Sequence, residues 1–543
     1  MKTLEGNIVD IIRKRIYSAR IFFDTHIQKI EPLPDLIDGK FILPGLVDAH
    51  VHIESAMLPP AEFARLAVRN GVLAAVADPH EIANVLGRDG IDFMIENSDQ
   101  IPFRFIFGAP SCVPATPFDN AGASIKDSDI DELFITGKAC YLSEMMNFPG
   151  VLHHDPEVMA KIAVAHKHGK PVDGHAPGLT GEPLKYYIKS GISTDHECTA
   201  LKEAEEKIRM GMKILIREGS AAKNFDALCP LIEKFPEQVM LCTDDCHPDD
   251  LIRGSIHSII AKGVEKGLDV FSLLQAATLN PIKHYRINLG LLQTGDSADF
   301  VIVDNLNDFT VHQSFLQGVC LYDSAGENED YFTARQEFTT YPNRFGASAI
   351  SAPDIHIVAS SGKMKVIQAF DGALFTKELI YDVPKGEPVV SDIKNDILKI
   401  IVVNRYHPIK PAVGFIHGFG LRKGALVTTV AHDSHHIIGV GCDDNSLVSV
   451  INHIIDLKGG LAAYYDQQLL DLKLDIAGLM SSAPGVDVAR DYSLLNQAAA
   501  QMGCTLSSPF MTLSFMALLV IPELKIGDRG LFDVNKFNGT ELF

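Results

Sequence analysis

The stretch Asp48-Ala49-His50-Val51-His52 closes an apolar run, residues 41–47, that is predicted to form a buried β-strand. Side chains at positions i and i+2 of a strand point to the same side and lie within about 7 Å of each other. Two imidazoles placed in this way at the C-terminal end of a strand can bind one metal ion, because neutral imidazole nitrogen suits Zn, Fe, Mn and Ni. Alone, the pattern is weak evidence, since a polar strand edge explains most such pairs.

Further apolar runs of strand length follow this first one, and most of them end in a histidine, a carboxylate or an arginine. Segments with helical character, such as residues 60–70 and 156–168, separate the runs. Strands that alternate with helices predict parallel βα units, and eight such units close a barrel. The later runs cover residues 72–77, 103–107, 139–143, 171–174, 191–195, 213–216 and 239–243.

In such a barrel the polar residues at the C-terminal strand ends face one shared mouth. Each candidate has an ordinary explanation when taken alone: His175 as a loop histidine, Glu144 as a carboxylate at a helix N-terminus, Asp244 as a helix cap. Six candidates in register at strand ends are better explained by one shared metal site. The residues predicted to converge there are His50, His52, Glu144, His175, His196 and Asp244.

Several motifs resemble those of a known family. Residues 43–52 and 295–304 are similar to motifs of the amidohydrolase superfamily. Within it, the motifs that resemble the adenine deaminase family are Asp78-Pro79-His80-Glu81-Ile82-Ala83-Asn84, Glu144-Met145-Met146-Asn147, Thr243-Asp244-Asp245 and Val430-Ala431-His432-Asp433-Ser434-His435. The resemblance covers nearly the whole chain. It implies metal-dependent hydrolysis of adenine, a small purine base, to hypoxanthine and ammonia at a centre that holds two divalent ions.

The strand pattern and the resemblance predict an α/β fold with three regions. A (β/α)8 TIM-like barrel is expected over residues 48–287, and residues 1–47 and 288–345 are expected to form a small β-sandwich beside it. Residues 350–543 are predicted to be an additional C-terminal α/β domain. The polar stretch 327–343 has no clear periodicity and is predicted to be a loop or linker.

Composition is consistent with an enzyme of several domains. The chain has 543 residues, of which 46% are hydrophobic and 22% are charged. The net charge of -21 argues against duplex nucleic acid or an anionic membrane as partner, since neither would attract it. Nine scattered cysteines and a start without an apolar signal core predict reduced thiols and a cytoplasmic location. Residues 510–521 are apolar but too short to span a bilayer, and enzymes of this size are often homo-oligomers.

The reaction that the resemblance implies suggests a role for each metal ligand. Displacing ammonia from a 6-aminopurine needs a hydroxide at neutral pH, which a metal-bound water supplies. We assign His50 and His52 to one metal, His175 and His196 to the other, and Glu144 to a bridging position. Many amidohydrolases bridge with a carbamylated lysine at this point of the barrel, but the lysine here, Lys138, lies before the strand. The ligand set admits Mn, Fe or Zn, and the resemblance favours manganese or iron, with manganese as the first choice.

Asp244 is the candidate proton shuttle, because a carboxylate near the hydroxide can accept its proton and pass it to the leaving amine. The adjacent Asp245 cannot point the same way and is predicted to bind the imidazole edge of the purine. His80, Glu81 and Arg217, on neighbouring strand-end loops, are candidates for contacts with the ring nitrogens.

Three other kinds of protein share part of these patterns. The zinc nucleobase deaminases use H-x-E with a later P-C-x-x-C, and His52-Ile53-Glu54 matches the first half while no C-x-x-C occurs in the chain. An amidohydrolase acting on a cyclic amide or another aminopurine would share the barrel and the metal ligands. A non-catalytic binding protein would tolerate the loss of ligands, yet all six are present.

A dense polar cluster, His432-Asp433-Ser434-His435-His436, lies between two predicted strands at residues 426–431 and 437–441. Spacing alone favours a polar turn. The sharper hypothesis is that this turn leans over the barrel mouth of its own or a partner subunit and helps to close the active site. The density of titratable groups and the resemblance both motivate that hypothesis.

Overall fold

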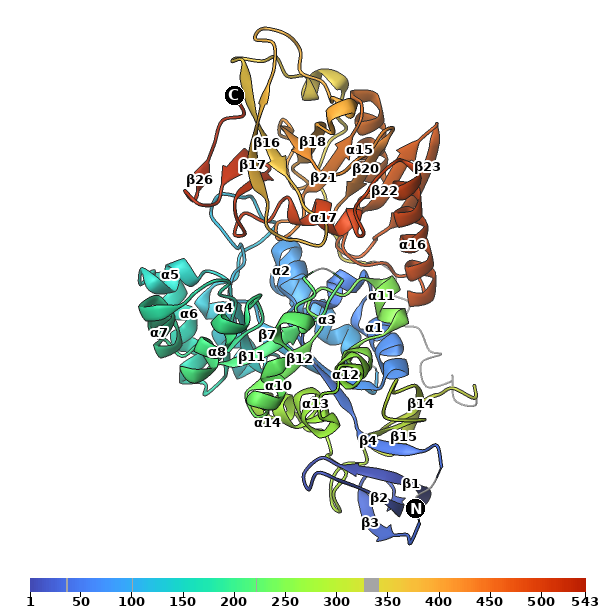
Figure 1. Cartoon of the computed structure of the whole chain (residues 1–543). Helices are drawn as coiled ribbons and strands as arrows, with labels where there is room; N and C mark the ends of the chain where they lie inside the picture. Colours follow the sequence, from blue (N-terminus) through green and yellow to red (C-terminus); the bar gives the residue numbers. More distant parts are fainter. Residues whose placement is uncertain (36–37, 100, 221, 327–340) are drawn as a thin grey trace.

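The computed structural model of the chain describes residues 1–35, 38–99, 101–220, 222–326 and 341–543. The predicted linker at 327–343 therefore lies outside the described residues except for its last three positions. Figure 1 shows three regions in a row, with a small sheet at the N-terminal end, a barrel in the middle and a larger sheet above it.

Parallel strands form the middle region. Five of them pair in the order β5-β6-β7-β8-β9 and three in the order β10-β11-β12. Parallel bridges between Val172 and Ile192 and between Val51 and Asp244 join the two sheets at both seams. The parallel strands therefore fit the predicted TIM-like barrel. Its strands are β5 (Leu46–Val51), β6 (Val72–Ala77), β7 (Arg104–Ala109), β8 (Tyr141–Met145), β9 (Val172–Gly174), β10 (Thr194–Asp195), β11 (Lys213–Arg217) and β12 (Val239–Cys242).

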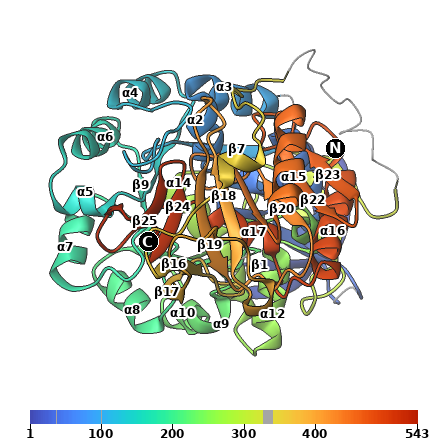
Figure 2. The same cartoon turned by 90° about the horizontal axis from the view of Figure 1, so that it is seen from above.

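Helices surround these strands, as the view from above shows (Figure 2). Every residue of β5 and β6 is buried, which explains why these strands are almost continuous apolar runs in the sequence. The helices are α1 (Pro60–Ala67), α2 (His80–Leu86), α3 (Arg88–Ser98), α4 (Asp127–Ile135), α5 (Phe148–Leu152), α6 (Pro156–Lys167), α7 (Gly181–Lys189), α8 (Leu201–Arg209), α9 (Phe225–Leu228), α10 (Pro230–Lys234), α11 (Pro248–Arg253), α12 (Ile256–Glu265), α13 (Val270–Ala277) and α14 (Leu279–Tyr285).

The segments that flank the barrel form one sheet of order β15-β14-β13-β4-β1-β2-β3. The ring of Phe23 on β2 packs edge-on against Phe300 at 5.2 Å and Phe315 at 5.9 Å, and such contacts between strands that are not neighbours indicate that the sheet curls. The expected small β-sandwich is thus a single curled sheet, since β4 pairs with both β1 and β13 and joins the two halves. The strands are β1 (Lys2–Asp10), β2 (Arg15–Phe23), β3 (Ile27–Pro32), β4 (Phe41–Pro44), β13 (Phe300–Val303), β14 (Val311–Leu316) and β15 (Val319–Asp323).

The C-terminal region contains a mixed sheet of order β17-β16-β19-β18-β21-β20-β22-β23. Alternate residues of β18 face opposite sides of this sheet. Ile401 packs on the side of helix α15 (Asp444–Leu457). Ile400 packs on the other side, in the core that extends to the barrel. The strands are β16 (Lys363–Gln368), β17 (Lys377–Asp382), β18 (Leu398–Val403), β19 (Ala412–His417), β20 (Ala425–Thr428), β21 (Ile437–Gly441), β22 (Gly460–Tyr465) and β23 (Gln468–Lys473).

Two helices and a small sheet complete this region. Helix α16 (Gly485–Gln501) and the short helix α17 (Pro509–Phe515) follow β23, and α17 lies between the C-terminal sheet and the barrel (Figure 1). The small sheet consists of β24 (Leu524–Gly527), β25 (Gly530–Asp533) and β26 (Asn538–Gly539). The apolar segment 510–521 is almost entirely buried, as predicted, and no described helix is long and apolar enough to cross a membrane.

Candidate active site

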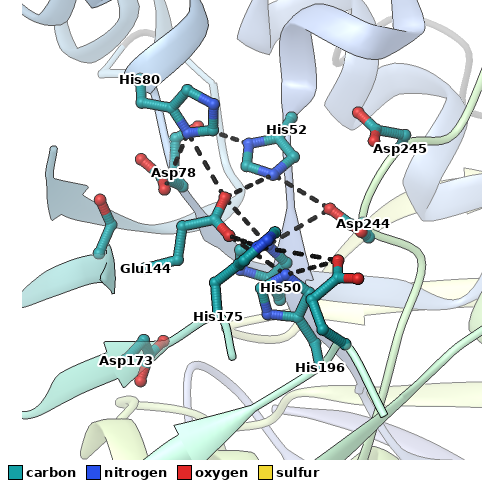
Figure 3. Close-up of polar contacts among 12 residues, drawn as sticks. His50, His52, Asp78, His80, Glu144, Asp173, His175, His196, Asp244 and Asp245 are labelled. Atoms are coloured by element: carbon teal, nitrogen blue, oxygen red, sulfur yellow. Dashed lines mark hydrogen bonds and ion pairs between the residues drawn. The ribbon is translucent and has the colours of Figure 1, made fainter. Parts of the chain in front are cut away.

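Six predicted metal ligands converge at the carboxyl ends of the barrel strands (Figure 3). His50 and Glu144 lie within β5 and β8. The other four lie one or two residues beyond a strand end, where the chain turns into the mouth, and all six are buried. These four are His52, His175, His196 and Asp244.

The backbone of Asp244 fixes this carboxylate opposite the first histidine pair. Its N–H donates to the carbonyl of His50 at 2.9 Å, and its carbonyl accepts from the N–H of His52 at 3.0 Å. The φ angle of Asp244 is +56°, a left-handed conformation that Asp adopts more readily than most residues. Buried Asp48 holds the same turn by accepting from the backbone N–H and the hydroxyl of Thr243, and burial raises the pKa of Asp48 to about 7.

The two carboxylate oxygens of Glu144 face different histidine pairs. Oε1 lies 3.2 Å from Nε2 of His52 and 4.0 Å from Nε2 of His50. Oε2 lies 2.7 Å from Nδ1 of His175 and 3.2 Å from Nε2 of His196. Burial alone would raise the pKa of Glu144, but the surrounding imidazoles outweigh burial and hold that pKa well below its usual value. Glu144 is therefore an anion between two groups of nitrogen ligands.

These donors fit divalent cations. Nε2 of His50 is buried without a hydrogen-bond partner, a costly state that a bound cation would relieve. It lies 3.4 Å from Oδ1 of Asp244, the oxygen that is also 3.0 Å from Nε2 of His52. His175 and His196 gather in the same way around Glu197. Imidazole and carboxylate donors at such spacings are typical ligands of Zn, Fe and Mn.

Arg217 joins two carboxylates of this site. Its Nη1 donates to Oδ2 of Asp244 and, at 2.5 Å, to Oε1 of Glu197, and its Nη2 donates to the other Glu197 oxygen at 3.2 Å. The sequence predicted a purine contact for Arg217, whereas the structure places its guanidinium against these acids. Glu197 was not predicted. Its position directly after His196, beyond the end of β10, was the signal that could have identified it.

Comparisons with known proteins agree with this architecture. A model described as the amidohydrolase family matches residues 41–321, and one described as the adenine deaminase C-terminal domain matches residues 373–538. The chain is 50% identical over 558 residues to an adenine deaminase of Methanosarcina mazei, with 100% of both chains covered. It belongs to the adenine deaminase family. An adenine deaminase of Sulfurovum sp. is 47% identical, and one of Borreliella afzelii 43%, each covering 98% of both chains. The resemblance that the motifs indicated is confirmed.

The C-terminal region of this adenine deaminase family member contacts the barrel mouth of the same chain. Nδ1 of His432 lies 2.5 Å from Oε1 of Glu81, and Nε2 of His435 donates to Oε2. Because Nδ1 of His435 accepts from the N–H of Ala431 at 3.2 Å, its proton sits on Nε2. Burial lowers the pKa of His435 to about 4. Burial would also lower the pKa of His432, but the nearby Glu81 carboxylate outweighs burial and raises the pKa of His432 to about 9. The polar turn between β20 and β21 therefore lies over the barrel mouth of its own chain, which is the placement that the second hypothesis for this turn predicted.

Two other predicted purine contacts lie beside this turn. Asp245 accepts from the hydroxyl of Ser55 at 2.5 Å, and burial followed by repulsion from Asp244 raises the pKa of Asp245. Nδ1 of His80 is 3.1 Å from Asp78, and its Nε2 is 3.5 Å from Glu81. His80 is buried at the mouth, and Asp245 is partly buried there.

These groups line a cavity at the barrel mouth. The barrel contributes a polar wall that contains Glu144, Asp244 and Asp245. The opposite wall is apolar and comes mainly from the C-terminal region, and sequence reasoning did not identify it. The apolar side chains that line the cavity are Met146, Leu374, Phe515, Leu518 and Ile521.

Proposed function

We propose that this chain hydrolyses adenine to hypoxanthine and ammonia, a reaction of purine salvage. Curated adenine deaminases match it over its full length, at 43–50% identity. The observation that carries the proposal is the position of Glu144, with one oxygen toward each histidine pair in the cavity at the barrel mouth. The polar and apolar walls of that cavity offer hydrogen-bonding groups for the edge of a planar, uncharged base and apolar surface for its face.

The residues that would hold a dinuclear centre fall into two groups. His50, His52 and Asp244 would hold one divalent cation, and His175 and His196 the other, with Glu144 shared between them. Manganese is our proposal for both positions, and iron and zinc suit the same donors. When bound, such a cation lowers the pKa of a water molecule toward neutrality.

A carboxylate is the proposed bridge because the chain offers no lysine at this point. Nζ of Lys138 lies 2.6 Å from Asp92 in a partly exposed ion pair, away from the histidines. Glu144 has two oxygens, a negative charge and a buried position between the histidine pairs. These three properties are those that a bridging ligand needs.

Asp244 is the proposed proton shuttle. Arg217 fixes its Oδ2, while Oδ1 faces His50 and His52. Burial opposes ionisation of Asp244, but Arg217 outweighs burial and keeps its pKa well below the usual value, so that the carboxylate is free to accept a proton. The carboxylate takes a proton from the attacking water and passes it to the amino nitrogen at C6. The water oxygen bonds to C6, the C6–N bond breaks so that ammonia leaves with the transferred proton, and the remaining hydroxyl proton moves to N1 to give hypoxanthine.

The purine itself is proposed to lie between the two walls. Asp245 and Glu81 can accept hydrogen bonds from ring N–H groups, and His80 can donate to a ring nitrogen. His432 and His435 hold Glu81 by both oxygens, which leaves its carboxylate little freedom to rotate. The apolar side chains of the opposite wall would cover the face of the ring.

One assay tests this function. Purified enzyme is incubated with adenine, ammonia and hypoxanthine are measured together, and the metal content is determined on the same sample. Equal amounts of both products with close to two metals per chain are expected. A metal-loaded enzyme that releases no ammonia from adenine, but opens a cyclic amide, would redirect the proposal to another amidohydrolase reaction.

We also propose a cytoplasmic homo-oligomer that binds neither nucleic acid nor membrane. The net charge of -21 supports the proposal that the chain binds neither nucleic acid nor membrane, because phosphate backbones and anionic lipids repel a negatively charged surface. Light scattering after gel filtration measures the oligomer, and a retardation assay with duplex DNA at low salt measures nucleic-acid binding.

A further inference from the structure

Lys525, on β24, is a buried cation behind the apolar wall of the cavity. Its side chain has no exposed surface, and Nζ donates to the carbonyl of Leu374 at 2.7 Å and to that of Phe515 at 2.9 Å. Among the described residues no ion pair involves Lys525. Burying an amine without a counter-charge costs free energy, so its presence here needs an explanation.

Both carbonyls belong to residues whose side chains line the cavity. Leu374 lies in the connection between β16 and β17, and Phe515 is the last residue of α17. These two wall segments are more than a hundred residues apart in the sequence and meet at one amino group. The hydroxyl of Thr376 donates to the carbonyl of Leu524 at 2.7 Å, so β24 binds the first segment a second time.

The local chemistry suits this bridging position. A helix leaves its last carbonyls without intrahelical partners, and a cationic or donating group at that end stabilises it. Two acceptors also match the two N–H bonds of a neutral amine, and burial lowers the pKa of Lys525 to about 7. The amino group can therefore hold both carbonyls in either protonation state.

We propose that Lys525 is a positioning residue for adenine binding, which holds Leu374 and Phe515 at a fixed height above the purine ring. The inference rests on the proposed placement of the purine in this cavity. A lysine that serves stability is expected to have an anionic partner, as Lys399 does. That lysine is equally buried in the same region, and its Nζ lies 2.5 Å from Asp444.

The test compares lysine-to-methionine changes at these two positions in the full-length, metal-loaded enzyme. Lys525→Met keeps the volume and removes both donors, so we expect KM for adenine to rise roughly tenfold with a smaller change in kcat. Its Tm should stay equal or increase, because an unpaired buried amine is removed. Lys399→Met should lower Tm, since it leaves Asp444 without its cation, and leave KM unchanged. Metal content should be unchanged in both variants.

Two further variants separate the possible failures. Phe515→Ala tests the placement of the purine, and an unchanged KM in that variant would reject the placement itself. If Phe515→Ala raises KM while Lys525→Met and Lys525→Gln bind adenine like the wild type, the role of Lys525 is overturned. If neither Lys525 variant folds, the lysine serves folding, and the proposal is overturned as well. Lys525→Gln keeps a donating NH2 group on a shorter side chain and should give an intermediate KM.

Discussion

The barrel wall and the C-terminal wall of the cavity differ in what holds their side chains in place. On the barrel wall the six proposed metal ligands lie in a strand or within two residues of its end, and strand pairing determines their positions. On the C-terminal wall the side chains come from a loop, a short helix and a polar turn. Lys525 connects the loop with the short helix, and His432 and His435 connect the turn with Glu81 of the barrel.

The two walls meet two different requirements of the reaction. Metal binding and proton transfer need groups placed to a fraction of an ångström, which rigid strands provide. Enclosing the base needs a surface that admits the substrate and then excludes water, which segments outside the barrel can provide. Changes on the barrel wall should therefore act on turnover and metal content, and changes on the C-terminal wall on KM.

The largest effect is expected for Asp244→Asn. The amide cannot accept the proton of the attacking water, so kcat should fall by roughly 10³-fold or more, within the range for loss of an acid–base group. At least one metal should remain bound, which elemental analysis of the same sample would show. Retention of near-normal kcat with full metal content would transfer the shuttle to another residue.

Glu144→Gln should weaken the binding of the metal pair while the barrel still folds. The amide keeps the shape of the side chain but loses the negative charge that two cations would share, and an affinity loss of roughly 100-fold is expected. Metal titration followed by activity measures it, and Lys138→Ala is the control that should change little. Two tightly bound metals with normal turnover in Glu144→Gln would contradict the bridging assignment.

The two walls also differ in how well the sequence predicts them. The strand-end ligands could be predicted because the i, i+2 spacing of His50 and His52 and the apolar runs are local patterns. The apolar wall could not, since nothing near Phe515 in the sequence indicates whether its ring faces a cavity or a core. Arg217 was expected to bind the purine, and the structure gives it two carboxylates that only the folded barrel brings together.

The C-terminal turn should affect substrate binding more than chemistry. Replacing both His432 and His435 with Asn removes the groups that hold Glu81, and KM for adenine should rise roughly tenfold. Metal content and the circular dichroism spectrum should not change. His453→Asn, a partly exposed histidine of the same region, is the matched control. Unchanged kinetics toward adenine in the double variant would return the turn to a structural role.

A smaller and more selective effect is expected for Asp245→Asn. This side chain faces the cavity beside Asp244 but is held by Ser55, so its loss should change how the base is bound. The ratio of kcat/KM for adenine and for other 6-aminopurines should shift by a few-fold. An equal loss for all substrates, like that of Asp244→Asn, would mean that the two aspartates exchange roles.

The smallest expected effect concerns the pH dependence of stability at Lys525, and it leaves catalysis aside. Burial lowers the pKa of this lysine to about 7 from its usual 10.5. Between those two values the unfolded chain binds more protons than the folded one, so this group makes the wild type more stable as pH rises, by up to about 1.4 kcal/mol per pH unit. Lys525→Met lacks that contribution.

The difference in Tm between Lys525→Met and the wild type, in favour of the variant, should be largest near pH 7 and should become smaller toward pH 9.5. All other titrating groups are the same in both proteins, so their effects cancel in this difference. Thermal unfolding of the two proteins across that range measures the gap. A difference in Tm that does not depend on pH would show that burying this amine costs no free energy of folding. The contrast between a barrel wall positioned by strands and a C-terminal wall held by a destabilising lysine would then lose its support.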